Sequence, residues 1–241
     1  MQVGTVLSLP GAALAELAGS AFDFAWIDLE HGALGVAEAQ TMAIGLAAAG
    51  CEAHVRLPAT GAERLAAVID AGVDGVVVPR VESPEQVEAL VARLRYPPLG
   101  RRGFGPRRAG EYGRRAAFWD SADSHVRLTV QIESPAGVDA AAEIAAVDGV
   151  DALVVGCSDL SLELDVPQDL ESRPLRAAVA AVAAAAAGAG VRFGVAAGGD
   201  PAAVAALAGD AELLVYSADT RLYSAAVDAA ARALEGVDAA V

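Results

Sequence analysis

Short apolar runs alternate with longer, alanine-rich stretches along the whole chain. Eight of the runs are five or six residues long, which is typical of buried parallel strands. They are TVLSL (5–9), FAWIDL (24–29), AHVRL (53–57), GVVVP (75–79), LTVQIE (128–133), ALVVG (152–156), RFGVAA (192–197) and LLVYS (213–217). Stretches with helical character lie between and after them, at 11–19, 36–49, 61–71, 84–95, 135–147, 174–189, 201–208 and 220–234. The pattern predicts repeated strand–helix units.

Three of the predicted helices begin with a recognisable start signal. Ser83-Pro84, Ser134-Pro135 and Asp200-Pro201 each place a capping residue before proline at the first helical position. Eight strand–helix units without a break in composition predict an α/β fold, a (β/α)8 TIM barrel, as a single domain over residues 1–241. A doubly wound open sheet is the alternative topology.

Two segments do not fit the simple repeat. Residues 96–125 are rich in glycine and arginine and too long for an ordinary connection, which indicates a functional loop or part of an interface. The predicted helix at 220–234 carries an apolar stripe of Leu222, Ala226, Ala230 and Leu234 at roughly helical spacing. This stripe has two interpretations: it packs against a neighbouring subunit, or it covers its own barrel.

The charge of the chain narrows its possible partners. Hydrophobic residues make up 55% of the chain, enough for a sizeable core, and the formal net charge is −15. This charge argues against nucleic acid and against anionic membranes, although a local arginine can still hold an anionic substrate. The longest apolar stretch, between Arg176 and Arg192, is too short to span a bilayer.

Cysteine and lysine usage also limit the chemistry. Two cysteines, Cys51 and Cys157, are too few for a disulfide framework, so we expect a reducing cytoplasm. The first residues have no basic region, and Glu16 interrupts their apolar stretch, so we expect no signal peptide. All seventeen basic residues are arginine. Without lysine, no side-chain amine can form a Schiff base with a carbonyl substrate.

Polar side chains gather where the predicted strands end. In a (β/α)8 barrel these ends meet at one rim, where catalytic groups lie. The rim residues, in chain order, are Asp28, Glu30, His31, Arg56, Arg80, Gln131, Glu133, Ser158 and Asp159.

Glu133 and Asp159 end consecutive predicted strands. Neighbouring parallel strands lie about 4.8 Å apart, and two carboxylates at such a separation need a proton or a cation between them. A hard divalent ion with oxygen ligands fits this pair, with Mg²⁺ or Mn²⁺ the natural choices. The alternative is that Glu133 caps the next helix and Asp159 caps a turn.

Arg56 and His31 are the other candidates for chemistry at the rim. Arg56 can clamp a substrate carboxylate through two parallel hydrogen bonds, or pair structurally with Asp28 or Glu30. In the motif WIDLEHG (26–32), His31 can act as a general base oriented by a carboxylate; the alternative is a structural histidine. We assign His54 and His125 structural roles.

Taken together, these motifs resemble the HpcH/HpaI family of metal-dependent, class II pyruvate aldolases. The stretches that carry the resemblance are GTVLSLP, FDFAWIDLEHG, VRLP, DAGVDGVVVPRVES, RYPPLGRRGFG, VQIESPAGV, VDGVDALVVGCSDLS and SADTRL, which follow the family's order between residues 4 and 222. The resemblance implies a (β/α)8 barrel that cleaves or forms a bond between pyruvate and an aldehyde. It also implies a divalent cation (Mg²⁺, Mn²⁺ or Co²⁺) as cofactor and a homo-oligomer, with a hexamer expected and the helix at 220–234 at its subunit interface.

The resemblance also assigns roles to single residues. Glu133 and Asp159 match the metal ligands. Arg56 matches the arginine that holds the pyruvate carbonyl and enolate oxygen. His31 matches the catalytic histidine and Asp28 the acid that orients it.

Three further assignments are looser. Asp70 matches an acidic catalytic residue that can approach a neighbouring subunit's site, and Gln131 and Ser158 are expected to contact substrate. The family commonly has proline where this chain has Cys157, which adds a thiol near the site; we interpret Cys157 as a packing residue.

Two other functions remain open on the sequence. One is a related lyase or decarboxylase that acts on another oxo-acid, such as oxaloacetate or a citramalyl- or malyl-CoA. The other is a non-catalytic barrel used for binding. The sequence does not identify the aldehyde, and both sugar-acid and dicarboxylic substrates are compatible with it.

Overall fold

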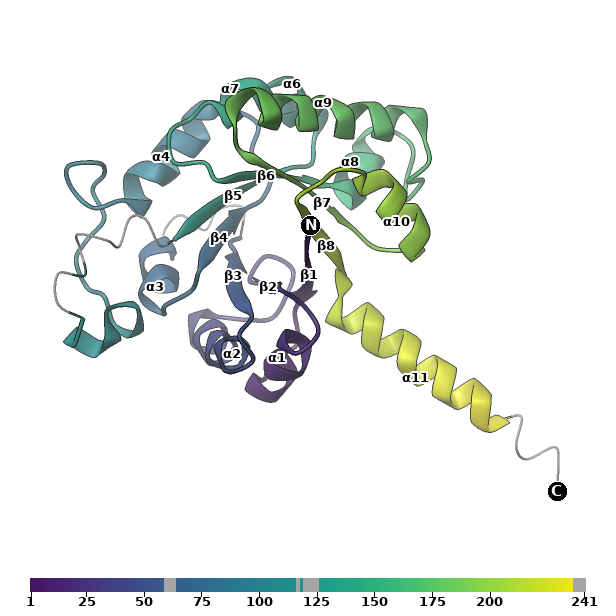
Figure 1. Ribbon diagram of the computed structural model, residues 1–241, viewed down its shortest axis with the longest axis horizontal. Helices are drawn as coiled ribbons and strands as arrows, with labels where there is room; N and C mark the ends of the chain where they lie inside the picture. The colour runs from purple at the N-terminus through teal and green to yellow at the C-terminus, as the bar shows by residue number, and fades with distance from the viewer. Residues whose placement is uncertain (59–63, 116–117, 119–125, 236–241) are drawn as a thin grey trace.

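A closed, all-parallel barrel of eight strands forms the centre of the molecule (Figure 1). The structure is a computed structural model that describes residues 1–58, 64–115, 118 and 126–235. The strands are β1 (Gln2–Leu7), β2 (Phe24–Asp28), β3 (Glu52–Arg56), β4 (Gly75–Val78), β5 (Arg127–Ile132), β6 (Ala152–Gly156), β7 (Arg192–Ala197) and β8 (Leu213–Ala218). They neighbour one another in chain order, and β8 pairs with β1. The predicted (β/α)8 barrel is confirmed, and the alternative open sheet is wrong.

Helices surround the barrel and follow the predicted pattern with two differences. They are α1 (Ala12–Gly19), α2 (Val36–Ala48), α3 (Leu65–Asp70), α4 (Pro84–Leu94), α6 (Pro135–Asp139), α7 (Ala141–Ala145), α8 (Cys157–Glu163), α9 (Arg173–Ala189), α10 (Pro201–Ala208) and α11 (Asp219–Glu235). The helix predicted at 135–147 is interrupted at Ala140. The short α8, which follows β6 directly, was not predicted.

Two of the three start signals act as helix caps through a side-chain hydrogen bond. Ser134 Oγ accepts a hydrogen bond from the Gly137 backbone N–H at 3.1 Å, and Asp200 Oδ1 accepts one from Ala203 N–H at 3.0 Å. These bonds satisfy amide donors that have no partner within the helix. They also fix where α6 and α10 begin, immediately after the barrel rim in the case of α6.

Apolar side chains fill the inside of the barrel. The buried inner cluster consists of Phe24, Trp26, Val77, Ala152, Val154, Leu213 and Val215. A larger cluster packs between the outer faces of the strands and the surrounding helices. Because the interior is a packed core rather than a channel, a substrate site can form only at an end of the barrel.

The described part of the irregular segment at 96–125 packs against the end of α3 and the turn that leads into β4. It contains a 3₁₀ helix, η2 (Arg108–Gly113). Arg102 lies 4.6 Å from the Tyr96 ring centroid and bonds to Asp70, and Arg108 donates to the carbonyl of Gly72 at 2.5 Å. These two arginines therefore have structural partners. His125 lies outside the described residues.

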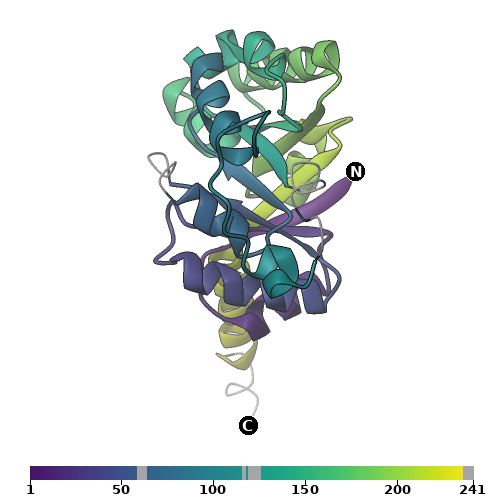
Figure 2. The same ribbon diagram turned by 90° about the vertical axis from the view of Figure 1, so that its left-hand side faces the viewer.

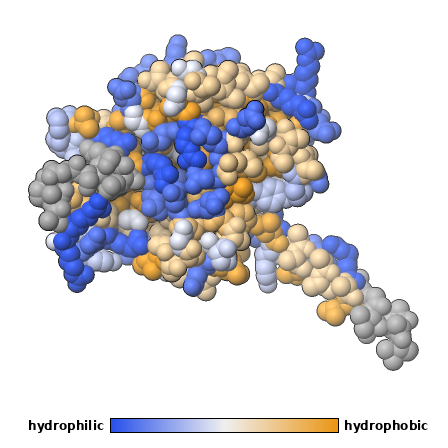
Figure 3. Space-filling model, in the orientation of Figure 1, coloured by the Kyte–Doolittle hydropathy of each residue, from blue (hydrophilic) through white to orange (hydrophobic). Residues whose placement is uncertain are grey.

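The last helix departs from the barrel. In Figures 1 and 2, α11 extends away from the body of the molecule, and its main barrel contacts are with β1 and β8 at its own start. Apolar side chains are exposed along it (Figure 3), including Leu222, Tyr223, Val227 and Leu234. The interpretation that this helix covers its own barrel is therefore wrong. In the described part of the chain, no helix has the length and apolar character needed to cross a membrane.

Candidate active site

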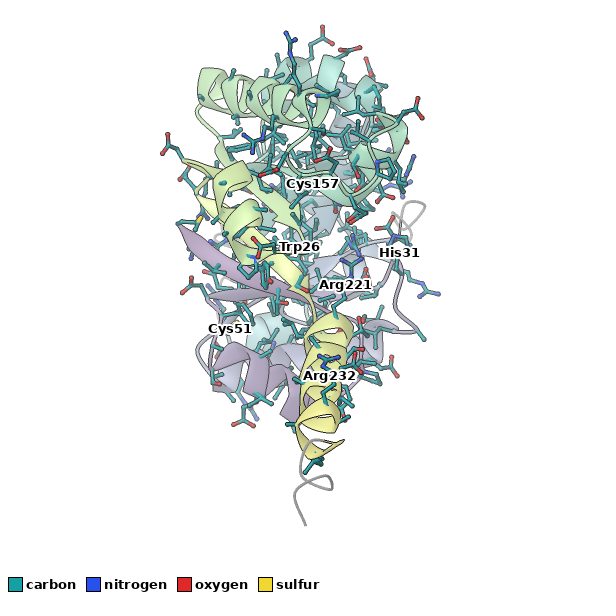
Figure 4. All side chains as sticks on the ribbon, turned by 90° about the vertical axis from the view of Figure 1, so that its right-hand side faces the viewer. Trp26, His31, Cys51, Cys157, Arg221 and Arg232 are labelled. Carbon is teal, nitrogen blue, oxygen red and sulfur yellow. The ribbon has the colours of Figure 1, made fainter. Side chains whose placement is uncertain are left out.

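The carboxyl ends of the strands surround a cavity of about 510 Å³. Six of the predicted site residues line it: Asp28, His31, Arg56, Gln131, Ser158 and Asp159. Figure 4 shows His31 at this end of the barrel and Cys51, which precedes β3, at the other. The structure thus brings together side chains from β2, β3, β5 and the start of α8, with the buried Trp26 at the floor.

Asp28 and Arg56 form a two-pronged ion pair at the ends of β2 and β3. The two residues are directly paired in the strand register. Arg56 Nη2 donates to Asp28 Oδ2 at 2.7 Å, and Nε donates to Oδ1 at 2.9 Å. Burial opposes ionisation of Asp28, but the bonds from Arg56 and from backbone N–H groups outweigh it and lower its pKa. The pair is therefore charged and fixed in place.

This pair confirms the structural alternative for Arg56 without excluding substrate binding. Glu30 also lies 3.4 Å from Arg56 Nε. The Nη1 group of Arg56, by contrast, donates to no residue in the described part of the chain, and Arg56 lines the cavity. One edge of the guanidinium is held by Asp28, and Nη1 remains able to donate to a bound molecule.

His31 lies at the rim, and its neighbouring carboxylate is that of Glu30 instead of the expected Asp28. Its side chain is 67% exposed, and its Nε2 lies 3.7 Å from Glu30 Oε2. Asp28 contacts His31 only through the backbone N–H, at 3.4 Å, because the Asp28 carboxylate is occupied by Arg56. In this structure the carboxylate beside the imidazole is therefore that of Glu30, which the sequence predicted only as a possible partner of Arg56.

Glu133 is buried directly after β5, with 1% of its surface exposed. It accepts hydrogen bonds from the Arg80 backbone N–H at 2.8 Å and from Gln131 Nε2. At Gly156 a Cβ would lie 2.5 Å from Glu133 Oε2, so a glycine at the end of β6 leaves room for the carboxylate. Glu133 does not cap the next helix, since Ser134 does.

Asp159 completes the carboxylate pair from the first turn of α8. Burial first, and then the negative charges of Asp159 and Glu30, raise the pKa of Glu133 to about 7. Two carboxylates in this relation share a proton or hold a cation. The sequence predicted Asp159 at the end of a strand, or as the cap of a turn; the structure instead begins a helix at Cys157, immediately after β6.

The donors at this pair fit a hard divalent cation. Carboxylate oxygens are the ligands that Mg²⁺ and Mn²⁺ prefer, together with waters. Gln131 Oε1 is also buried, and within the described residues it has no hydrogen-bond partner. Among the described residues, no three His, Cys, Asp or Glu side chains converge, so the protein would supply two carboxylates. Water or substrate oxygens would have to supply the remaining ligands.

Cys157 and Ser158 have different environments at the start of α8. The Cys157 thiol is buried, its Sγ lies 3.9 Å from the Val155 carbonyl oxygen, and burial raises its pKa to about 12. A thiol that stays protonated is a poor ligand, which supports its interpretation as a packing residue. Ser158 lines the cavity, as expected for a substrate contact.

Asp70 is not part of this cavity. It ends α3, which runs back along the barrel from the rim, so Asp70 lies near the start of β4. Its Oδ1 accepts a hydrogen bond from Arg102 Nη2 at 2.5 Å. A catalytic role for Asp70 is therefore possible only in the site of another subunit, and it stays a prediction.

Sequence reasoning missed the part played by two other residues. Arg80 has a left-handed backbone (φ 53°), and this conformation points its N–H at Glu133. Its side chain bonds to Glu163 of α8 at 2.9 Å. Arg221, at the start of α11, lines the cavity. Neither backbone conformation nor the position of a helix start relative to the barrel is encoded in a local motif.

The chain is similar to known proteins over most of its length. A family model described as HpcH/HpaI aldolase/citrate lyase matches residues 6–224. The chain is 40% identical over 164 residues to the 4-hydroxy-2-oxovalerate aldolase of Novosphingobium aromaticivorans, a match that covers 67% of this chain and 62% of that protein. It is 34% identical over 197 residues to the hydroxypyruvate/pyruvate aldolase of Agrobacterium fabrum, covering 80% and 74% respectively. This chain thus spans 62% of the length of the first of these relatives.

A solved structure extends the similarity to nearly the full length. The HpcH/HpaI aldolase/citrate lyase family protein from Burkholderia cenocepacia J2315 is 34% identical, with a TM-score of 0.87. The match covers 98% of this chain and 94% of that one. The chain therefore belongs to the HpcH/HpaI aldolase/citrate lyase family.

Proposed function

We propose that this protein is a carbon–carbon lyase that interconverts a 4-hydroxy-2-oxo acid with pyruvate and an aldehyde. The observation that carries the proposal is one cavity lined by Asp159 and by the Arg56–Asp28 ion pair, with the buried Glu133 close enough to both Asp159 and Arg56 for their charges to act on it. Relatives with aldolase names support it, among them the 4-hydroxy-2-oxovalerate aldolase cited above. The resident cofactor is proposed to be Mg²⁺, Mn²⁺ or Co²⁺.

The reaction needs a group that accepts electrons. Cleavage of the bond between C3 and C4 leaves the enolate of pyruvate, and a chain without lysine cannot form an iminium. A divalent cation held by Glu133 and Asp159 would, when bound, polarise the 2-oxo group and stabilise the enolate charge.

Arg56 is proposed to hold the oxo-acid from the opposite side. Its Nη1 donates toward the oxygen that becomes negative, while Asp28 keeps the guanidinium plane fixed through Nε and Nη2. Gln131, which is buried beside Glu133 and lines the cavity, is proposed to contact the same end of the substrate, with Ser158 beside it. Donors fixed before substrate arrives need no reorganisation during the reaction.

His31 is proposed to move the hydroxyl proton of the aldol. It is exposed at the rim, where a substrate hydroxyl can reach it, and its Nε2 lies 3.7 Å from Glu30 Oε2. Asp28 contributes indirectly, because it fixes the loop that carries His31 through the backbone N–H groups of Glu30 and His31. The proton therefore passes between solvent and substrate at the mouth of the cavity.

A condensation assay tests this function. Pyruvate and a series of short aldehydes, with Mg²⁺, Mn²⁺ or Co²⁺ added, should give 4-hydroxy-2-oxo acids, and chelation should stop their formation. Decarboxylation of oxaloacetate, or cleavage of a malyl- or citramalyl-CoA, without any condensation would favour the related lyases. Binding of pyruvate without turnover of any of these compounds would favour a non-catalytic barrel.

We also propose a homo-oligomer, with a hexamer as the expected state and α11 packed against a neighbour. The helix leaves the barrel with its apolar side chains exposed, and a lone exposed stripe of this kind is typical of an interface. A neighbouring subunit would also be needed to bring Asp70 to a site. A cytoplasmic location is proposed as well, because both cysteines are buried free thiols.

Light scattering checks the assembly. The wild-type protein should have several times the subunit mass of 24.2 kDa. Replacing Val227 with Asp should lower the mass, since a charge in an apolar interface is costly. Replacing the exposed Glu143 of α7 with Gln is the matched control and should leave the mass unchanged. A wild-type monomer would contradict the proposed assembly and the proposed role of Asp70.

A further inference from the structure

The cavity has a second side, built by β7, β8 and β1, that the proposed chemistry leaves unused. Ser8 follows β1, Gly198 follows β7, Ser217 lies in β8, and Thr220 and Arg221 begin α11. All five residues line the same cavity as the residues of the proposed catalytic side. The described residues that line this second side include hydroxyls and one guanidinium but no carboxylate.

Arg221 has no partner in the part of the chain that the structure describes. It takes part there in no hydrogen bond, ion pair or ring contact, although the chain carries a net charge of −15. Its guanidinium lies over the loop after β7, since a Cβ at Gly198 would come within 2.8 Å of Arg221 Nη1. Figure 4 shows Arg221 where α11 joins the barrel.

The acidic residue at the same helix start is already bound elsewhere. The Asp219 carboxylate accepts hydrogen bonds from the backbone N–H groups of Ser8 and Leu9 and from the Ser8 hydroxyl, each at 2.8 Å. These bonds tie the loop after β1 to the start of α11. Asp219 therefore does not neutralise the nearby Arg221, which has no ion-pair partner among the described residues.

The backbone of β8 is reshaped at the same place. Gly4 pairs with Val215, but Val6 pairs with Ala218, so β8 holds one extra residue there. Within this bulge Ser217 adopts a left-handed conformation (φ 59°), which is strained for a residue with a side chain. Bulges and strain of this kind are concentrated next to active sites, where they redirect side chains. The second side is therefore a built surface rather than a chance opening.

We propose that Arg221 binds an anionic group at the far end of the aldehyde half of the substrate. This inference rests on the proposed aldolase function, and it narrows the substrate to 4-hydroxy-2-oxo acids that end in a second carboxylate or a phosphate. A cavity of about 510 Å³ holds a small ligand whole. The oxo-acid end then lies at Arg56 and the second anion at Arg221, with the hydroxyls of Ser217 and Thr220 beside the chain between them.

The test compares two aldehydes of similar shape and different charge. Pyruvate is condensed with 4-oxobutanoate and with its neutral methyl ester, and the ratio of the two kcat/KM values is measured. Arg221→Leu should lower the anionic-to-neutral ratio about 10- to 100-fold, as expected for loss of one hydrogen bond to a charged group. Arg221→Lys should lower it less, because the charge remains. Glyceraldehyde 3-phosphate against glyceraldehyde repeats the comparison for a phosphate.

Arg232→Leu is the matched control, because Arg232 lies on the same helix outside the cavity (Figure 4). Its ratio should equal that of the wild type. Partial misfolding of a variant lowers both rates together and leaves the ratio unchanged. If the wild type forms product and Arg221→Leu leaves the anionic-to-neutral ratio of kcat/KM unchanged for both pairs of aldehydes, the assignment of Arg221 is overturned. The proposed aldolase function is not affected by that result. Failure of the wild type to condense pyruvate with any of the four aldehydes overturns this assignment together with the proposed function.

Discussion

Replacing Glu133 with Gln, or Asp159 with Asn, is expected to lower divalent-metal affinity and turnover by at least ~10-fold each. Each change removes one of the two carboxylates that the protein offers to the cation while keeping the side-chain shape. Glu133 is the more sensitive position, because it is buried, accepts the Arg80 N–H and lies against Gly156. Metal binding followed by calorimetry on the variants, and turnover with added Mg²⁺ or Mn²⁺, measure the two effects.

The pH dependence of metal binding is an independent test of whether Glu133 and Asp159 hold the cation. The pKa of Glu133 in the metal-free protein is raised to about 7, mainly by burial and then by Asp159. Below that pH a cation must displace a proton, so its apparent affinity should fall as the pH is lowered through 7 and level off above it. Glu143→Gln, a change of an exposed carboxylate on α7, serves as the control. Unchanged affinity in both Glu133→Gln and Asp159→Asn would contradict the metal assignment.

Replacing Arg56 with Lys is expected to lower turnover about 10²- to 10³-fold, the usual cost of losing a fixed donor to a developing oxyanion. Lysine keeps the positive charge but cannot hold Asp28 through two atoms and donate to substrate with a third. The kinetic constants should therefore change mainly in kcat, while the net charge of the site is preserved.

The effect of Arg56→Lys on turnover has to be separated from its effect on stability. Arg56 and Asp28 are both largely buried, so loss of their pairing is also expected to lower the melting temperature. Arg173→Lys, on the exposed start of α9, is the control for the substitution itself. Turnover of Arg56→Lys equal to the wild type, in folded protein, would exclude Arg56 from substrate binding.

Much of the fold was predictable because each strand is a short apolar run and each helix an alanine-rich stretch. All eight strands begin and end within three residues of the predicted runs, since burial on both faces leaves little room for polar residues. The missed helix, α8, begins at Cys157 without a loop or a capping side chain. No start signal of the kind found at Ser134-Pro135 marks it, and it places Asp159 on a helix instead of a turn.

The site was predictable where its residues directly follow strands, and less so elsewhere. Asp28 and Arg56 were expected as possible partners because neighbouring strands bring their ends together. The contribution of Arg80 depends on a left-handed backbone, and that of Arg221 depends on where α11 meets the barrel. Both arise from tertiary structure, and arginine has no sequence signature for either. The His31 imidazole lies beside Glu30, while the Asp28 carboxylate is bound to Arg56, and the motif alone does not distinguish these two arrangements.

Exchange of the methyl protons of pyruvate with solvent tests the central claim most directly, because it requires the enolate but no aldehyde. Proton NMR in D₂O should show loss of the methyl signal with wild-type protein and a divalent cation, and no loss after chelation. If His31 removes the methyl proton, His31→Ala should slow exchange by roughly 10²- to 10⁴-fold; if it acts only on the aldol hydroxyl, exchange should persist while cleavage is lost. Absence of metal-dependent exchange in wild-type protein with confirmed bound metal would contradict the proposed pyruvate enolate chemistry.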